Sequence, residues 1–313
     1  MSRAFVFPGQ GSQAVGMGKD LADAFPVARE VFQEVDEALK QNLTKLMFEG
    51  PEDELTLTEN AQPALMAASM AAMAVLKVEG EVDIAKVASF VAGHSLGEYS
   101  ALAAAGAFSL SDTARLLKTR GQAMQQAVPV GEGAMAALLG LDLDMAKEVV
   151  DEAAQGDVLV TANDNAPGQV VVSGKREAVE RAVDVAKEKG AKRAMLLQVS
   201  APFHCPMMAP AADVMAEALA AVELLPPILP LIANVTAAPV EDPAEIRRLL
   251  VEQVTGMVRW RECCMTMRAK GVEKLVEVGS GKVLSGLARR IDKELSASNV
   301  STPAGVEEFL ATL

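Results

Sequence analysis

The chain has 313 residues, half of them apolar, and carries a formal net charge of −13. So acidic a protein repels phosphate backbones, and we therefore expect no nucleic-acid partner. Three cysteines and two widely separated histidines fit neither a disulfide framework nor a zinc site, so we expect no metal, no cofactor and a reducing, cytoplasmic location. We also expect a monomer.

The chain begins with a predicted strand, Ala4 to Phe7, which leads into a glycine-rich loop. The loop matches the dinucleotide fingerprint G-x-G-x-x-A, but Pro8 precedes it and two further glycines would fall inside the helix that should hold a pyrophosphate. This argues against a nucleotide site. Helical sequence follows, and its most apolar part, Ala64 to Leu76, is shorter than the roughly 20 residues that a membrane span needs. We expect a buried helix there, no membrane partner and no signal peptide.

A nucleophile elbow is predicted at Gly93-His94-Ser95-Leu96-Gly97, directly after the apolar run from Val87 to Ala92, which reads as a strand. Glycines let the chain turn sharply from a strand into a helix, and such a turn holds the serine hydroxyl exposed. The helix that begins here offers free backbone N–H groups to an oxyanion. We therefore predict that Ser95 is a nucleophile. The alternative is a serine that only caps the helix.

The base for this serine is predicted to be His204, because His94 is the immediate neighbour of Ser95 and adjacent side chains on a turn rarely meet. A proline two residues away on each side places His204 in a loop. The order Ser then His agrees with hydrolase-type triads, although no acidic residue can be chosen from sequence to orient the histidine. For the same reason of adjacency, we reject Cys205 as an alternative nucleophile.

A separate unit is predicted for residues 130–199. It begins at a linker-like Pro/Gly stretch and follows the order βαββαβ, which is typical of a ferredoxin-like fold. The predicted elements are a strand at Met135–Leu139, a helix at Asp144–Ala154, strands at Val158–Thr161 and Gln169–Val172, a helix at Arg176–Lys189 and a strand at Ala194–Val199. Residues 1–129 and 200–313 would form the larger domain, and a cleft between the two is a usual place for a substrate.

The larger domain is predicted to be a hydrolase-like α/β core with a mostly parallel sheet, because strands and helices alternate along it. The remaining predicted elements are a helix from Ser111 or Asp112 to about Ala127, a helix from Pro210, a strand at Leu231–Val235, a helix from Asp242 and a final strand at Lys274–Val278. Asp242 is followed by a proline and, three residues on, by a glutamate, a favourable helix start.

Five motifs, in order over nearly the whole chain, resemble one family. They are Phe7–Gln13, Gly93–Tyr99, Lys118–Gly121, Asn163–Val170 and Pro202–His204. The chain resembles the malonyl-CoA:acyl carrier protein transacylases, acyltransferases of fatty acid and polyketide synthesis. The resemblance implies that malonyl-CoA and acyl carrier protein are the partners, and that the malonyl group passes between them through a malonyl-serine.

The resemblance also implies a role for each catalytic position. Ser95 would carry the malonyl group and His204 would be its base. In this family a main-chain carbonyl orients the histidine, and Gln253 falls at the matching place. The backbone N–H groups of Gln10 and Leu96 would form the oxyanion hole.

Substrate binding is implied for three residues. Arg120 would pair with the malonyl carboxylate, Phe203 would wall the pocket beside the base, and Asn163 would line it. Two departures from the family's pattern occur at Ser280 and at Met257–Val258. We expect both in loops outside the catalytic positions.

Other functions remain open at this point. A serine hydrolase or thioesterase would share the elbow but use water as the acceptor, and a binding subunit would keep the fold without catalysis. The pathway would be fatty acid synthesis or, alternatively, polyketide synthesis. Because carrier proteins are acidic like this chain, docking would need a local basic patch, for which the candidates are Arg247, Arg248, Lys270, Lys282, Arg289 and Arg290.

Overall fold

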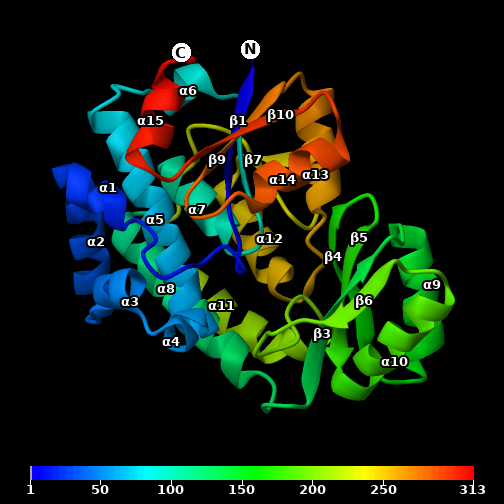
Figure 1. Cartoon of the computed structure of the whole chain (residues 1–313). Helices are drawn as coiled ribbons and strands as arrows, with labels where there is room; N and C mark the ends of the chain where they lie inside the picture. Colours follow the sequence, from blue (N-terminus) through cyan, green and yellow to red (C-terminus); the bar gives the residue numbers. More distant parts are fainter. Residues whose placement is uncertain (1) are drawn as a thin grey trace.

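The computed structural model describes residues 2–313, which form a mixed α/β fold with two separate sheets (Figure 1). The first sheet has six strands in the order β10-β9-β1-β2-β7-β8, and only the β7–β8 pair is antiparallel. Its strands are β1 (Arg3–Phe7), β2 (Phe90–Gly93), β7 (Leu231–Ile232), β8 (Pro239–Val240), β9 (Lys274–Val278) and β10 (Ser296–Val300). The predicted α/β class with a mostly parallel sheet is confirmed.

Both faces of this sheet are buried. In β1, Phe5 and Phe7 enter the main hydrophobic core, whereas Ala4 and Val6 enter a second core on the opposite face. This follows from the alternation of side chains along a strand, and burial on both faces is usual for parallel sheets. The second core is covered by α13 (Trp260–Ala269) and α14 (Val283–Ile291).

The helices that contribute to the main core come from all parts of the chain outside the second sheet. They are α1 (Lys19–Ala24), α2 (Pro26–Leu39), α3 (Leu43–Glu49), α4 (Glu52–Thr56), α5 (Thr58–Val78), α6 (Ile84–Val87), α7 (Gly97–Ala104), α8 (Leu110–Gln126), α11 (Ala209–Ala220), α12 (Pro243–Thr255) and α15 (Pro303–Leu310), with the short 3₁₀ turn η1 (Pro206–Met208). Helix α5 is long and apolar enough to cross a membrane by composition, yet 78% of its most apolar window is buried inside the protein.

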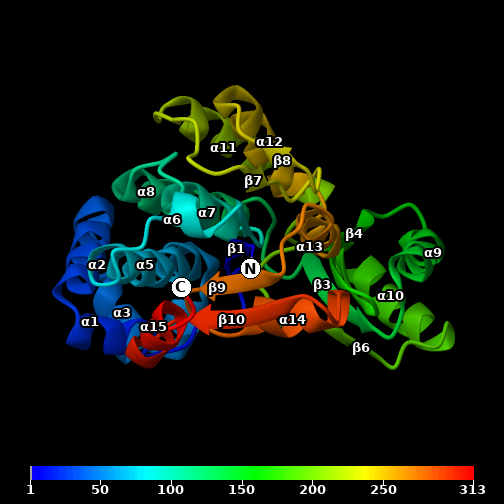
Figure 2. The same ribbon diagram turned by 90° about the horizontal axis from the view of Figure 1, so that it is seen from above.

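The second sheet is antiparallel, in the order β4-β5-β3-β6, and lies to one side of the larger part (Figure 2). In chain order its elements are β3 (Gly133–Leu139), α9 (Leu143–Ala154), β4 (Leu159–Ala166), β5 (Gln169–Lys175), α10 (Arg176–Glu188) and β6 (Arg193–Leu196), which is the predicted sequence of elements. Val170 and Val172 pack with the two helices in a third core, whereas Val171 between them joins the main core. This sheet therefore presents one face to the larger part.

Backbone pairing ties the two parts together. The Val258 N–H donates to the Ala162 carbonyl at 2.9 Å, and the Asp164 N–H donates to the Val258 carbonyl at 3.0 Å. Beside this bridge, buried Asp164 forms an ion pair with Arg261 at 2.8 Å. Val258, one of the positions at which the sequence departs from the family's pattern, thus lies at the junction of the two sheets.

Several predicted boundaries were wrong. The strand predicted from Val87 begins only at Phe90, because Val87 ends the short helix α6, whose cap is Asp83. The helix predicted from Ser111 or Asp112 begins at Leu110, since the Ser109 hydroxyl accepts the backbone N–H of Asp112.

Strand lengths also differ from the prediction. The strand predicted to reach Val199 ends at Leu196. The Leu197 N–H still donates to the Met135 carbonyl of β3, but the Val199 N–H turns back to the Leu197 carbonyl, so the extended pairing goes no further. The strand predicted as Leu231–Val235 pairs only at Leu231–Ile232, and Lys274–Val278 is followed by one more strand, β10. In contrast, the helix start at Asp242 is confirmed: its carboxylate accepts the Glu245 N–H at 2.8 Å.

Candidate active site

Ser95 lies at the sharp turn between β2 and α7 and has a φ of +53°, in the left-handed region that serine seldom adopts. Both glycines of the motif are required by close packing. A Cβ on Gly93 would lie 1.9 Å from the Gly97 backbone, and one on Gly97 would lie 2.2 Å from the Phe7 carbonyl oxygen. The turn therefore needs glycine at both positions, as the elbow motif predicts.

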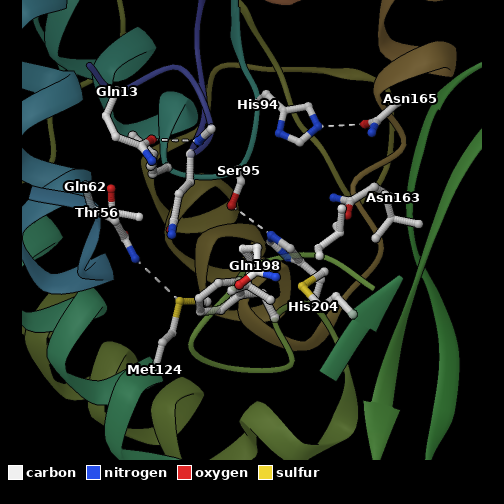
Figure 3. A pocket seen from close by; sticks show the side chains of 18 of the residues that line it. Gln13, Thr56, Gln62, His94, Ser95, Met124, Asn163, Asn165, Gln198 and His204 are labelled. Carbon is white, nitrogen blue, oxygen red and sulfur yellow. Dashed lines mark hydrogen bonds between the residues drawn. The ribbon is translucent and has the colours of Figure 1, made fainter. Parts of the chain in front are cut away.

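The structure brings the Ser95 hydroxyl to His204, with 2.7 Å between Oγ and Nε2 (Figure 3). On the other side of the ring, Nδ1 lies 2.9 Å from the main-chain carbonyl oxygen of Gln253. Because a carbonyl only accepts, Nδ1 must carry the proton, which leaves Nε2 free to accept the Ser95 hydroxyl. This is the arrangement of a nucleophile, a base and an orienting acceptor.

The electrostatic setting keeps this histidine neutral. Burial, with a further contribution from the nearby Arg120 charge, lowers the pKa of His204 to about 3. Only the neutral ring can take a proton, so the base is available at neutral pH. The other histidine, His94, has a different partner. Its Nε2 lies 2.8 Å from Oδ1 of Asn165, and Figure 3 shows the ring directed toward that residue.

Arg120 reaches the same site from α8 and is 1% exposed. Its Nη1 donates to Oε1 of Gln62 at 2.7 Å, and its Nη2 donates to Oε1 of Gln253 at 2.9 Å and to Oγ of Ser95 at 3.2 Å. Its Nε is buried without a hydrogen-bond partner, and within residues 2–313 no carboxylate forms an ion pair with it. The site therefore holds a buried cation with no carboxylate in direct contact beside the nucleophile, an arrangement that favours binding of an anion.

A cavity of about 340 Å³ opens beside these groups. The larger part contributes Arg120 and Phe203 to its wall, and the second sheet contributes Met135, Asn163 and Val171. The cavity therefore lies between the two sheets, as the sequence predicts for the cleft. A wider groove of about 820 Å³ shares part of this lining and extends to Arg176 on α10.

Gln10 and Leu96 line the same cavity as Ser95. Within the described residues 2–313, the backbone N–H of neither residue donates a hydrogen bond to a protein group. The side chain of Gln10 is held by the Thr58 hydroxyl at 2.9 Å. Two free N–H groups near the nucleophile can stabilise a negatively charged oxygen.

Three polar residues of the site were not predicted. Gln62 is a buried amide in the largely apolar helix α5, one of several buried polar residues there, so the sequence does not single it out. Glu98 lies in the first turn of α7, and burial raises its pKa to about 8. The side chain of Asn234 accepts the Ser95 N–H at 2.8 Å and donates to the Gly93 carbonyl at 2.7 Å. Nothing in the sequence around Asn234 signals this contact.

Other predicted features lie outside this arrangement. The Cys205 thiol is buried, donates to the Pro202 carbonyl and has a pKa raised by burial. The Ser280 hydroxyl donates to the Ser12 carbonyl at 2.7 Å, which fixes one glycine-rich loop against another. Among residues 2–313, no group of three or more His, Cys, Asp or Glu side chains is placed to hold a metal.

None of the six basic residues proposed for docking lines the cavity or the groove. Arg248 is paired with Glu245 and Glu252, and Arg290 donates to Gln169 at 2.7 Å.

Comparison with known proteins gives a consistent result. Residues 4–304 match the acyl transferase domain family. The malonyl CoA-acyl carrier protein transacylase of Bacillus subtilis is 46% identical over 311 residues, which is 99% of this chain and 96% of that protein. The acyl-carrier-protein-S-malonyltransferase of Bartonella henselae superposes with a TM-score of 0.98 at 57% identity, over 100% of this chain and 99% of that one. A type II PKS acyl-carrier protein in complex with its malonyl-transacylase gives a TM-score of 0.96 at 44% identity over 100% of both chains.

Proposed function

This chain belongs to the acyl transferase domain family, and we propose that it transfers the malonyl group from malonyl-CoA to the phosphopantetheine thiol of acyl carrier protein, supplying extender units for fatty acid synthesis. The observation that carries the proposal is Arg120. A buried guanidinium without a carboxylate partner, 3.2 Å from the Ser95 hydroxyl, matches an acyl group that ends in a carboxylate.

The first half-reaction forms the acyl-enzyme. The Ser95 oxygen attacks the thioester carbonyl carbon of malonyl-CoA while Nε2 of His204 takes the hydroxyl proton. The N–H groups of Gln10 and Leu96 stabilise the oxyanion of the tetrahedral intermediate, at about 3 kcal/mol for each such donor. When the carbon–sulfur bond breaks, His204 returns the proton to the leaving CoA sulfur.

The second half-reaction reverses these roles. The pantetheine thiol of the carrier gives its proton to His204 and attacks the malonyl ester. The intermediate then releases the Ser95 oxygen, which regains the proton, and the malonyl thioester leaves on the carrier. The two acyl transfers thus use one site in turn, in a ping-pong order.

Arg120 selects the acyl group in this scheme. A guanidinium offers paired donors that match a carboxylate as a fork, so malonyl compensates the buried charge and acetyl leaves it unpaired. Phe203 walls the cavity beside the base and disfavours a branched α-carbon, and Asn163 lines the same cavity. Wild-type transfer of methylmalonyl as fast as malonyl would contradict the role of Phe203.

Carrier docking is supported by the groove that continues from the cavity. Its volume of about 820 Å³ suits an extended pantetheine arm, and its wall carries one basic residue, Arg176, beside two acidic ones, Glu52 and Asp53. We therefore add Arg176 to the candidates for the basic docking patch because it lines this groove. Like Arg248 and Arg290 it has protein partners, the Gly131 carbonyl at 2.6 Å and the Glu180 carboxylate at 3.7 Å, so its position is the only ground for preferring it.

The test is the intact mass of the protein after brief exposure to malonyl-CoA or acetyl-CoA, followed by addition of carrier protein. We expect a malonyl adduct on the wild type that is absent in Ser95→Ala, and transfer of that adduct to the carrier. Release of CoA without an adduct, and equal turnover without carrier, would instead indicate a hydrolase. No adduct and no released CoA would indicate a binding subunit.

One observation favours a second pathway: a solved relative at 44% identity is a type II PKS malonyl-transacylase bound to its carrier. The acyl transfer would be the same, and only the carrier would differ. Comparing transfer rates to fatty acid and polyketide carriers of the same organism distinguishes the two pathways.

The remaining proposals concern the division into domains, the cellular location and the oligomeric state. We infer a hydrolase-like core from residues 1–129 and 200–313 and a ferredoxin-like unit from residues 130–199. The elbow in the parallel sheet and the order of the second sheet, β4-β5-β3-β6, support this division. We also propose a cytoplasmic monomer that binds neither membrane nor nucleic acid, which the net charge of −13 favours.

A further inference from the structure

A buried carboxylate is connected to the nucleophile through Asn234 and Gln253. Glu98, in the first turn of α7, is 1% exposed. The two other buried carboxylates have evident structural partners: Asp164 pairs with an arginine, and Glu277 accepts the N–H groups at the start of α14. Glu98 has no ion pair in the described chain, and instead it accepts hydrogen bonds from the Gln253 side chain and the Asn234 backbone. Both of these residues contact the catalytic groups.

Gln253 connects Glu98 to three functional residues. Its main-chain oxygen accepts from His204, its Nε2 donates to Glu98 and to the Ser95 carbonyl at 3.0 Å, and its Oε1 accepts from Nη2 of Arg120 at 2.9 Å. The two ends of an amide have nearly the same shape and differ in hydrogen bonding. Arg120 only donates, so it needs the oxygen end; an ionised Glu98 only accepts, so it needs the NH₂ end.

The second oxygen of Glu98 supports the elbow itself. Its Oε1 accepts the Asn234 N–H at 3.1 Å, and the Asn234 side chain in turn holds the backbone on both sides of the turn, at the Ser95 N–H and the Gly93 carbonyl. One carboxylate thus fixes both residues that surround the strained serine. Neither oxygen of Glu98 touches the cavity.

We propose that Glu98 is a positioning residue for acyl selection: its carboxylate fixes the orientation of the Gln253 amide, so that the amide oxygen faces Arg120 and holds the guanidinium where a malonyl carboxylate binds. This rests on the proposed function. Glu98→Gln is the sharpest test, because it keeps the shape and can still accept from Asn234. Its new NH₂ group, however, opposes the NH₂ group of Gln253 in the present orientation. Turning the Gln253 amide relieves this contact but places its NH₂ group against the Arg120 guanidinium and its oxygen against the Ser95 carbonyl, so that neither orientation satisfies all the partners.

The experiment compares single-turnover acylation of Ser95 by malonyl-CoA and by acetyl-CoA, and the readout is the ratio of the two rates. The ratio cancels any general loss of activity. Measurement at about pH 8.5 keeps Glu98 mostly ionised, because its pKa is raised to about 8. The variants are Glu98→Gln, Gln253→Leu and the double substitution. The matched control is Glu277→Gln, which alters another fully buried carboxylate away from the site.

We expect Glu98→Gln to lower the malonyl-to-acetyl ratio by about tenfold or more, the usual consequence of losing a hydrogen bond to a charged group. Gln253→Leu should lower it by a similar factor, and the double variant should be no worse than Gln253→Leu alone, because Glu98 acts through Gln253. Glu277→Gln should lower the melting temperature and leave the ratio unchanged.

A ratio within twofold of the wild type in Glu98→Gln, or fully additive effects in the double variant, overturns the proposal. If Glu98→Gln does not fold, Gln253→Leu decides: an unchanged ratio in that variant also overturns it. Failure of the proposed function looks different, since the wild type itself would then form no malonyl adduct.

Discussion

Replacing Arg120 by alanine isolates the largest electrostatic feature of the site. A malonyl carboxylate would gain two charge-assisted hydrogen bonds from this guanidinium, each worth about 1.5–3 kcal/mol. The variant should therefore lose about 3–6 kcal/mol of malonyl stabilisation, or about 10²–10⁴-fold in kcat/KM for malonyl-CoA. Acetyl-CoA should react as fast as with the wild type or faster, because acetylation of the wild type leaves the cation unpaired in a buried site.

The assay is the rate of adduct formation with each thioester by intact mass, with the melting temperature recorded alongside. Arg261→Ala is the control, because Arg261 also pairs with a buried group, Asp164, but does not line the active-site cavity. Equal losses for malonyl and acetyl in Arg120→Ala would refute the reasoning, since they would mean that Arg120 supports the fold of the site and does not select the acyl group.

Three further predictions follow from the same geometry. Because the pKa of His204 is lowered to about 3, its neutral form persists as pH falls, and the acylation rate should stay nearly constant from pH 7 to pH 5, below the range in which Glu98 titrates; a tenfold drop below pH 6.5 would contradict this. Gly93→Ala should lower the melting temperature sharply, whereas Gly286→Ala should not, because a Cβ at position 93 meets the Gly97 backbone at 1.9 Å and one at position 286 meets nothing within 4 Å. Native alkylation with iodoacetamide should not inactivate the enzyme, because the thiol of Cys205 is buried with a raised pKa; rapid inactivation at this residue would argue for a thiol role.

The chemistry of the site is local enough to be predicted from sequence. The elbow needs glycine at Gly93 and Gly97 for steric reasons, so the motif reports the backbone that holds Ser95. His204 could be chosen because the chain has only one other histidine. The roles of Arg120 and of the Gln253 carbonyl could be predicted only from the resemblance to a family. Their contacts with Ser95 and His204 join segments that lie far apart in the chain, so no local pattern reports them.

The rest depends on tertiary contacts that leave no local pattern. Asn234 lies 139 residues from Ser95 in sequence, and its side chain reaches the elbow only because β7 pairs beside β2. Strand β10, with the sequence Ser296–Val300, has no apolar run, and it is extended because it pairs with β9 at the edge of the sheet. Its edge position explains why a mostly polar sequence is tolerated there.

The two parts of the protein contribute different kinds of residue to the cavity wall. The reacting groups of Ser95 and His204, and the Gln253 carbonyl that orients His204, all lie outside residues 133–196. Met135, Asn163 and Val171 of the second sheet contribute only to the lining of the cavity. Size selection can therefore be redesigned at the cavity-lining side chains of the second sheet, such as Met135 and Val171. Asn165 should be kept in such a design, because it holds His94 beside the nucleophile, and so should the backbone bridge at Val258 that joins the two parts.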